Sequence, residues 1–478
     1  MVKRVSKELE GLQDYKGIIA CSFTKEASRQ LKDKIEAHSD IKASIISTLD
    51  SFVVDGFILR YKNRIIKNVY HSDTVPEKFV LQLTARQDEA EEITKDGECA
   101  NALRMKAYKK KWGENFCKGI CHVSFPIYQL AEYMLDNVPS VSNFYSKRFT
   151  SIYVDEAQDL NYFQISFLLK LIEKCKLKAV FVGDKNQSIY EFRGARPELF
   201  YNLIYKGFQP YNIDVSLRCD PSIAFFANLF LKDTDDLKDL SFNKQHVFYV
   251  SSFDFSKLRD KPFNFFILTE TNAYNEQCYL ECKKYGIDVA LAKKIKLDNE
   301  EYEKSYLSIL EEIISFYLNF RNDDLKQRYS FDDFMVFLEN YRIGIKEKDI
   351  YFDSNVTLEE YLTRICKLIG VPIDYSSFKS ILDQLSHDEV TNYYFRKSKQ
   401  NRIMTFHSSK GLEAECVIVY FTKPRRDSSD ANVRSAYVAF TRAEKNLIVV
   451  VPDEISGPFY NDFYNNYLEY KKRLTNTR

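Results

Sequence analysis

Two acidic residues follow directly on a short apolar run, at the point where a strand is predicted to end. Ile152, Tyr153 and Val154 are β-branched and aromatic residues typical of a buried strand, and Asp155 and Glu156 come next. Ligands bind at the carboxyl ends of the strands in an open parallel α/β sheet. One carboxylate there can hold Mg²⁺ while the next activates water, which is nucleoside triphosphatase chemistry. Taken alone, the pair also fits a solvated strand end.

A second predicted strand ends in the same way. Residues 179–182 are apolar and lead into Gly183 and Asp184, with Gln187 shortly after. Neighbouring parallel strands end at one edge of the sheet, so these polar groups and the two acids can meet one phosphate. The two stretches together predict an α/β fold built on a parallel sheet.

Composition limits the function without choosing it. The 478 residues suffice for two or more domains, and 45% hydrophobic with 29% charged residues is ordinary for a globular protein. The net charge of +1 means that any affinity for nucleic acid comes from local basic patches. Ten cysteines without a secretory signal predict reduced thiols and a cytoplasmic location, and no apolar run is long enough to span a membrane.

The two strand ends carry a family resemblance. Val154-Asp-Glu-Ala-Gln-Asp159 and Val182-Gly-Asp-Lys-Asn-Gln-Ser-Ile-Tyr-Glu-Phe-Arg-Gly194 resemble motifs II and III of the UvrD/Rep branch of superfamily 1 helicases. The resemblance implies two RecA-like parallel-sheet motor domains with mostly helical insertions, and ATP hydrolysis with Mg²⁺ between them. It implies that Asp155 and Glu156 hold the metal ion and the attacking water. Gln187 would then sense the γ-phosphate.

Further strings resemble the DNA-contacting motifs of the first motor domain. Residues 22–28 resemble motif Ia, and residues 47–52 resemble motif Ib with Asp50 where many relatives carry His. The loop after motif III adds aromatic rings able to stack on bases, next to a cation. The residues implied to bind DNA here are Ser22, Thr24, Thr48, Tyr190, Phe192 and Arg193.

The second half of the chain resembles motifs IV, V and VI. Arg218 of motif IV is implied as a γ-phosphate cation, and Arg442 of the string Tyr-Val-Ala-Phe-Thr-Arg-Ala as the arginine finger. In motif V, Gly411 and Glu413 are implied to reach the nucleotide, Glu413 by accepting a hydrogen bond from ribose. The motif V residues implied to face DNA are Thr405 and His407.

One part of the family pattern is missing from this sequence. The resemblance implies a Gly-rich phosphate loop ending in Gly-Lys-Ser/Thr, whose Lys would fall a few residues before Met1 by family spacing. Either the natural chain begins upstream of Met1, or this subunit has no competent ATP site. The other triphosphate-contacting residues are present, which favours the first interpretation.

The motif positions predict a domain division. Motor domain 1A is expected at residues 1–53 and 126–212, insertion 1B at 54–125, motor domain 2A at 213–289 and 401–455, a short helical insertion 2B at 290–400, and a C-terminal tail at 456–478. Within 1B, residues 104–112 interleave basic and aromatic side chains. That pattern suits a nucleic-acid contact and equally suits a solvated helix face.

Within the family, several strings resemble the helicase-like subunits of Gabija anti-phage systems. The features that carry this narrower resemblance are Asp50 in motif Ib, residues 192–200 after motif III, the Arg218-Cys219 pair in motif IV and the small size of the chain. The resemblance implies travel from 3′ to 5′ on single-stranded or partly duplex DNA. It also implies an OLD-type TOPRIM endonuclease as partner in a hetero-oligomer. Few residues follow motif VI in this sequence, so we expect any DNA cleavage to be carried out by that partner.

Two other functions stay open on the sequence. One is a catalytically weak subunit that senses DNA and docks on a nuclease, which the missing Lys supports. The other is an RNA-acting relative, since the motifs contain no evident test for a 2′-hydroxyl.

Overall fold

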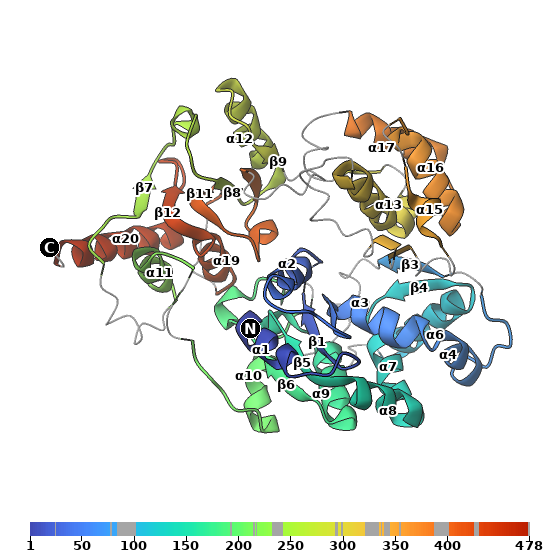
Figure 1. The fold of residues 1–478 in the computed structure, drawn as a ribbon. Helices are drawn as coiled ribbons and strands as arrows, with labels where there is room; N and C mark the ends of the chain where they lie inside the picture. Colours follow the sequence, from blue (N-terminus) through green and yellow to red (C-terminus); the bar gives the residue numbers. More distant parts are fainter. Residues whose placement is uncertain are drawn as a thin grey trace. The chain divides into compact units, whose positions relative to one another are not determined.

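The chain forms two compact units (Figure 1). Unit 1 comprises Met1–Phe208 and Lys296–Leu382, and unit 2 comprises Gln209–Ile295 and Asp383–Arg478. The structure is a computed structural model, and it describes residues 1–23, 25–76, 79–83, 102–191, 194–213, 216, 218–231, 242–291, 295–297, 300–320, 334–335, 337–338, 345–352, 355–386, 401–424 and 430–476.

Unit 1 is built on a four-stranded parallel sheet with the strand order β2-β1-β5-β6. The bounds are β1 Gly17–Ser22, β2 Ile45–Thr48, β5 Phe149–Val154 and β6 Lys178–Phe181. The strands predicted from the two apolar runs before the acidic residues are therefore confirmed as β5 and β6, and they are neighbours. Because all four strands run in one direction, their carboxyl ends form one edge.

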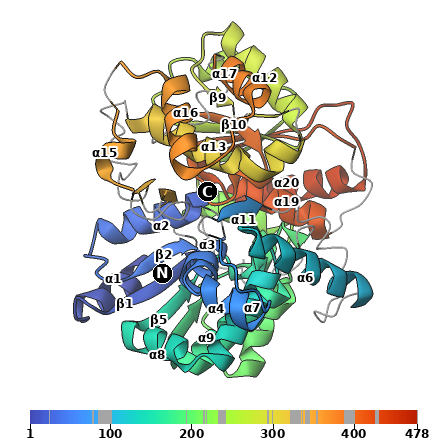
Figure 2. The ribbon, with the colours of Figure 1, turned by 90° about the vertical axis from the view of Figure 1, so that its right-hand side faces the viewer.

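Helices cover both faces of this sheet, as Figures 1 and 2 show. Alternate residues of a strand point to opposite faces. Ile18 and Ala20 of β1 pack with α1 (Val2–Glu10) and α2 (Lys25–Glu36), whereas Ile19 and Cys21 pack into a second core with the helices around β5. The other helical segments among the described residues up to 208 are α3 Leu49–Val53, η1 Val54–Leu59, α4 Lys62–Asn68, α6 Ala102–Cys117, α7 Pro126–Asn137, α8 Pro139–Arg148, η2 Ala157–Asp159, α9 Tyr162–Cys175, η3 Lys185–Gln187, α10 Pro197–Tyr201 and η5 Asn202–Lys206.

A small parallel ribbon of β3 (Val80–Leu83) and β4 (Ile120–Val123) lies beside α6. Trp112 of α6 is buried, stacks on Phe116 with ring centroids 5.1 Å apart, and donates its indole N–H to the His122 carbonyl at 3.0 Å. Its ring therefore belongs to the core and is not available to stack on a base. Residues 109–111, by contrast, are exposed lysines.

Glu8 joins α1 to the start of β5. Its carboxylate accepts hydrogen bonds from the hydroxyls of Thr150 at 2.7 Å, Ser151 at 2.8 Å and Tyr153 at 2.6 Å. Burial alone would raise the pKa of Glu8, but the three hydroxyls and the positive charge of Lys178 together hold that pKa below its usual value. The helix is thus attached to the strand that delivers the two acids.

Replacing Glu8 by Gln is expected to lower the free energy of unfolding at neutral pH by about 1–2 kcal/mol, because an amide is a weaker acceptor than a carboxylate. A depressed carboxyl pKa contributes stability above the unfolded-state value, and that stability is lost as the pH falls through the folded-state value. Denaturant unfolding between about pH 7 and pH 3 should show a shallower acid loss for Glu8→Gln than for the parent chain. Glu10→Gln, on the exposed side of α1, is the matched control. Equal pH slopes for all three chains would contradict this prediction.

Residues 296–382 add helices to unit 1, and α13 contacts β3. Their core is aromatic: Phe316 stacks on Phe334 with centroids 4.0 Å apart, and Tyr361 is buried nearby. Thr357 and Glu360 form a capping box at the start of α16, which ends at Gly370 with φ +75°. The bounds are α13 Glu300–Phe320, α15 Glu347–Ile350, α16 Leu358–Ile369 and α17 Tyr375–Leu385.

Unit 2 is built on a six-stranded parallel sheet with the order β7-β12-β11-β8-β10-β9. Apart from the partly buried Glu415 near its start, the inner strand β11 is buried along its length, as expected of a parallel strand covered on both sides. The strand bounds are β7 Val247–Val250, β8 Phe265–Thr269, β9 Ala290–Leu291, β10 Arg402–Thr405, β11 Ala414–Tyr420 and β12 Ala443–Val450. The helical segments are α11 Pro221–Asn228, η7 Phe255–Leu258, α12 Asn272–Lys284, η8 His407–Ser409, α19 Asp430–Phe440 and α20 Pro458–Asn476.

The residues expected to form a tail make up α20, which packs into the core of unit 2. Phe463 and Tyr470 are fully buried against Phe226 of α11. The Tyr470 hydroxyl accepts the backbone N–H groups of His246 at 3.1 Å and Val247 at 3.3 Å, just where β7 begins. Aromatic residues at helical spacing explain the packing, since they form one continuous apolar face.

The helices of the described ranges include none with the length and apolar character needed to cross a membrane.

Cys278 and Cys282 are spaced as CxxxC and face the core of unit 2. Burial there raises the pKa of both thiols to about 12.

Candidate functional site

The carboxyl edge of the unit 1 sheet gathers the acidic residues predicted from the sequence. The backbone N–H of Asp155 bonds the Cys21 carbonyl at 2.8 Å, and that of Val182 bonds the Val154 carbonyl at 2.8 Å. The strand ladder therefore continues to the residues that follow β5 and β6. Asp155 stands at the end of β5, directly between the ends of β1 and β6.

Glu156 has an unusual backbone conformation. Its φ of +53° and ψ of +41° lie in the left-handed region, which a non-glycine residue adopts at a cost of about 1 kcal/mol or more. The chain turns sharply here into η2, and the Ala157 N–H bonds the Val182 carbonyl at 2.9 Å. Asp155 therefore stands at the end of the strand and Glu156 in the turn that follows it, so two acids adjacent in sequence can take different roles.

The end of the neighbouring strand carries a second polar turn. Asp184 accepts the Asn186 N–H at 2.9 Å and the Gln187 side-chain amide at 3.1 Å. Gln158 lies between the two turns and bonds both Glu156 and Asp184. The structure thus brings Glu156 and Gln187, two of the residues predicted for hydrolysis, into one hydrogen-bonded group.

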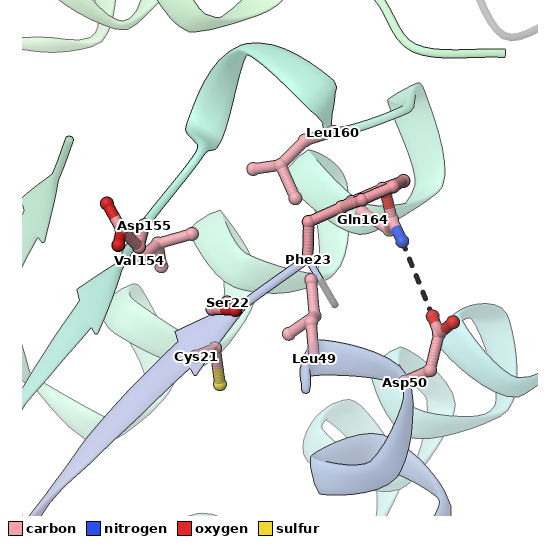
Figure 3. Close-up of a pocket in the computed structure, with 9 residues that line it drawn as sticks. All are labelled: Cys21, Ser22, Phe23, Leu49, Asp50, Val154, Asp155, Leu160 and Gln164. Carbon is pink, nitrogen blue, oxygen red and sulfur yellow. Dashed lines mark hydrogen bonds between the residues drawn. The ribbon is translucent and has the colours of Figure 1, made fainter. Parts of the chain in front are cut away.

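A hollow opens beside Asp155, and Figure 3 shows its lining. Ser22 at the end of β1 and Asp155 lie on one side, and Asp50 and Gln164 on the other. Cys21 also lines the hollow, but complete burial raises the pKa of its thiol so far that it stays a neutral, apolar group. The hollow therefore offers hydroxyl and carboxylate oxygens without a thiolate nucleophile.

Asp50, noted in the sequence for replacing a His, is part of a hydrogen-bonded cluster. Its carboxylate accepts the Tyr128 hydroxyl and the Gln164 amide, the latter at 3.4 Å (Figure 3), and Gln164 also donates to the Tyr128 oxygen at 3.1 Å. Gln164 closes the capping box of α9 with Asn161. The cluster holds α3, α7 and α9 together behind the hollow.

The residues of unit 1 predicted to bind DNA have structural contacts of their own. Thr48 caps α3 by accepting the Ser51 N–H at 3.1 Å. Ser22 is buried and accepts the Ser28 hydroxyl at 3.3 Å. Tyr190 is buried, with its ring stacked on Phe23 at 5.0 Å between centroids, so one face of the ring is already covered. The DNA roles stay predictions, and Thr24, Phe192 and Arg193 lie outside the described residues.

In unit 2, two residues predicted to contact the nucleotide are paired with each other. The Arg218 Nε lies 2.7 Å from Oε2 of Glu413, and both side chains are 38% exposed. Gly411, two residues earlier, has φ +84°, a conformation that side-chain-bearing residues rarely adopt. The predicted γ-phosphate cation is therefore neutralised by the predicted ribose acceptor in this structure.

Arg442, the predicted arginine finger, is fully buried. Its Nε donates to the Val438 carbonyl at 2.9 Å, Nη1 to the Leu412 carbonyl at 3.3 Å and Nη2 to the Thr441 hydroxyl at 3.1 Å. The guanidinium thus holds α19 to the loop before β11, and its catalytic role stays a prediction.

Thr405 and His407 lie at the end of β10. Thr405 Oγ1 accepts the Ser408 N–H at 3.3 Å, and η8 begins at His407, whose side chain is exposed. This turn presents polar groups at the carboxyl edge of the unit 2 sheet, which is the edge that the predicted DNA role requires.

The chemistry of the donor set at Asp155 fits a magnesium ion that arrives with phosphates. Carboxylate and hydroxyl oxygens are hard ligands, and Mg²⁺ takes only one or two protein carboxylates when a substrate phosphate completes its shell. Among the residues that the structure describes, no three or more His, Cys, Asp or Glu side chains form a ready-made metal cage. Asp155 would supply the carboxylate, and Glu156, which accepts the Gln158 amide, is given another role in the proposal below.

The residue that sequence reasoning missed is Gln158, which stands inside the motif II string but was given no role. Its partners Glu156 and Asp184 follow the ends of different strands, and Asp184 is 26 residues from Gln158 in the sequence. Gln158 could have been identified from the expected pairing of β5 with β6. That pairing brings Gly183 and Asp184 close to motif II.

Family comparisons agree with this geometry. Residues 84–207 match the UvrD/REP helicase N-terminal domain, and residues 401–450 match the UvrD-like helicase C-terminal domain. Separate stretches of the chain are therefore similar to the N-terminal and to the C-terminal domain models of the UvrD-like helicases. The predicted family resemblance is confirmed, and so is the fold class of two RecA-like parallel-sheet domains.

Among characterised relatives, the chain is similar to Gabija protein GajB of Bacillus cereus (strain VD045). The two are 23% identical over 499 residues, which covers 98% of this chain and 92% of that protein. ATP-dependent DNA helicase PcrA of Bacillus subtilis (strain 168) is 27% identical over 210 residues, or 37% of this chain and 28% of the helicase. DNA helicase II of Escherichia coli (strain K12) is 32% identical over 101 residues, which is 14% of that protein's length.

Proposed function

We propose that this chain is an ATP-dependent, UvrD-like DNA translocase or helicase that acts in an anti-phage defence complex. The proposal includes travel from 3′ to 5′ on single-stranded or partly duplex DNA. It also includes an OLD-type TOPRIM endonuclease as partner in a hetero-oligomer, and a cytoplasmic location. Similarity to Gabija protein GajB over nearly the whole of both chains supports the defence role.

The observation that carries the enzymatic part is the hydrogen-bonded group at the carboxyl edge of unit 1. Glu156, Gln158, Asp184 and Gln187 join the ends of two neighbouring strands, next to Asp155. A strained, left-handed residue such as Glu156 persists where surrounding contacts hold it, and such residues concentrate at active sites.

In the proposed reaction, Asp155 would hold Mg²⁺, which when bound neutralises charge on the triphosphate. Glu156, in the turn that follows Asp155, would accept a proton from the attacking water. Gln187 would orient that water or touch the terminal phosphate through its amide. Arg218 would supply a cation to the same phosphate once Glu413 releases it.

The test is ATP hydrolysis by the full natural chain with and without single-stranded DNA. The proposal expects a rate of about 1 s⁻¹ or faster in the presence of DNA, and a much lower rate without it. A chain that folds, binds DNA and shows no DNA-stimulated hydrolysis would contradict it.

A second candidate is a DNA-sensing or scaffold subunit that regulates a partner nuclease with little hydrolysis of its own. Two contacts in unit 2 favour it, since Arg442 is buried on backbone carbonyls and Arg218 is paired with Glu413. In that case the affinity for DNA or for the nuclease would be independent of ATP. Fluorescence anisotropy of labelled single-stranded DNA, with and without Mg²⁺-ATP, separates the two candidates.

A further inference from the structure

Gln158 occupies a position that an ordinary surface glutamine does not. It lies in η2, between Glu156 and the start of α9, and its side chain is fully buried. A buried amide needs a partner for both its oxygen and its nitrogen, because an unsatisfied polar group in the core costs free energy.

The partners of Gln158 define which way the amide points. The Asp184 backbone N–H is a donor, so it must meet the amide oxygen, Oε1, which lies 3.0 Å away. The amide nitrogen is then directed at Oε2 of Glu156, at 2.5 Å. One side chain therefore connects the carboxylate of the predicted base to the backbone that follows β6.

Gly183 leaves the space in which this amide lies. A Cβ placed on Gly183 would be 2.6 Å from Oε1 of Gln158 and 3.1 Å from its backbone nitrogen. The 2.6 Å contact is too short to persist, so a residue with a Cβ at this position would force the Gln158 amide to shift. The third contact of such a Cβ is the Phe200 ring at 3.2 Å, which closes the other side.

The same network reaches Gln187. Asp184, whose N–H bonds Gln158, accepts the Gln187 amide on its own carboxylate at 3.1 Å. Glu156 and Gln187 are thus linked through Gln158 and Asp184. The two turns are therefore joined through groups that are buried or half-buried.

We propose that Gln158 is a positioning residue that aims the Glu156 carboxylate and keeps it in register with the Gly183–Asp184 turn and Gln187. This inference rests on the proposed ATP hydrolysis for its kinetic consequence, but its geometric part does not. Gln158 itself contacts neither water nor phosphate in this role. Its effect is on the orientation of the base.

The kinetic test replaces Gln158 by Met, which keeps the length and removes the amide. We expect kcat for DNA-stimulated ATP hydrolysis to fall about 10- to 100-fold, as for other outer-shell partners, with KM for ATP changed less than about threefold. Added to Glu156→Gln, Gln158→Met should change the residual rate by less than about twofold, because the two residues act as a unit. Gln129→Met, on a partly exposed site of α7, is the matched control and should match the parent chain.

A second variant covers the case in which Gln158→Met does not fold. Gly183→Ala leaves the amide in place but pushes it away from Asp184, and it should reproduce the loss in kcat. An unchanged kcat in whichever of these two variants folds, while Glu156→Gln is inactive, would overturn the inference.

The geometric part is tested without nucleotide by a double-mutant cycle. The unfolding equilibrium constants of the parent chain, Glu156→Ala, Gln158→Met and the double variant are measured by urea denaturation. We expect a coupling of about fivefold or more between the two sites, whereas independent sites agree with additivity to within about twofold. Additivity would overturn the inference whatever the hydrolysis rate. Absence of hydrolysis in the parent chain would count against the proposed function alone, because the cycle uses no ATP.

Discussion

Replacement of Glu156 by Gln is expected to lower DNA-stimulated ATP hydrolysis by about a thousandfold, within the range that one general base contributes. An amide has the size of the carboxylate but cannot take a proton from water. Glu156 also lies in the left-handed region, and the backbone after it is held by the hydrogen bond from the Ala157 N–H to the Val182 carbonyl, which the substitution leaves in place. The variant should therefore fold like the parent chain and still bind DNA.

A coupled assay of ATP hydrolysis at saturating DNA measures this effect, together with denaturant unfolding as a check on the fold. Glu173→Gln is the control, since Glu173 is an exposed carboxylate on α9 of the same unit. If Glu156→Gln kept more than about a tenth of the activity, Glu156 would not be the base. The sensor function would then be the stronger candidate, provided that DNA binding was also independent of ATP.

Replacement of Arg442 by Ala is expected to lower the free energy of unfolding of unit 2 by about 3 kcal/mol. The side chain is fully buried, and its removal takes the guanidinium donors from the carbonyls of Val438 and Leu412 and opens a space behind α19. The expected loss of hydrolysis in this variant would then have a structural cause as well as any catalytic one. A Lys at this position cannot supply the same fork of donors, so Arg442→Lys should recover little of the stability.

Hydrogen exchange of the β11 and β12 amides measures the effect in unit 2 itself. Arg218→Ala is the contrasting control, because that side chain is 38% exposed and its ion pair with Glu413 contributes about 0–1 kcal/mol. Unchanged protection of β11 in Arg442→Ala, combined with lost hydrolysis, would show that Arg442 is not needed for the fold of unit 2. That result would favour the arginine-finger role implied by the resemblance.

The fold class and the principal acids were predictable from the sequence. Short apolar β-branched runs that stop in polar residues predict strands of a parallel sheet, and they place Asp155, Glu156 and Asp184 at its carboxyl edge. These predictions succeeded because the signal is local, since the strand and the group that it delivers are adjacent in the chain. The family was predictable for the same reason, because each motif is a short run of residues that are adjacent in the sequence.

The partners of each side chain depended on the tertiary structure. Trp112 looked exposed within a basic stretch, yet it is buried against Phe116 because β4 lies beneath α6. Gln158 gains its position only when β6 pairs with β5 and brings Gly183 against it, and Arg442 becomes buried only when α19 packs on the loop before β11. Periodicity along a chain reports which faces are apolar, whereas burial and hydrogen-bond partners depend on which distant segments share a face. Those pairings were determined by packing in three dimensions.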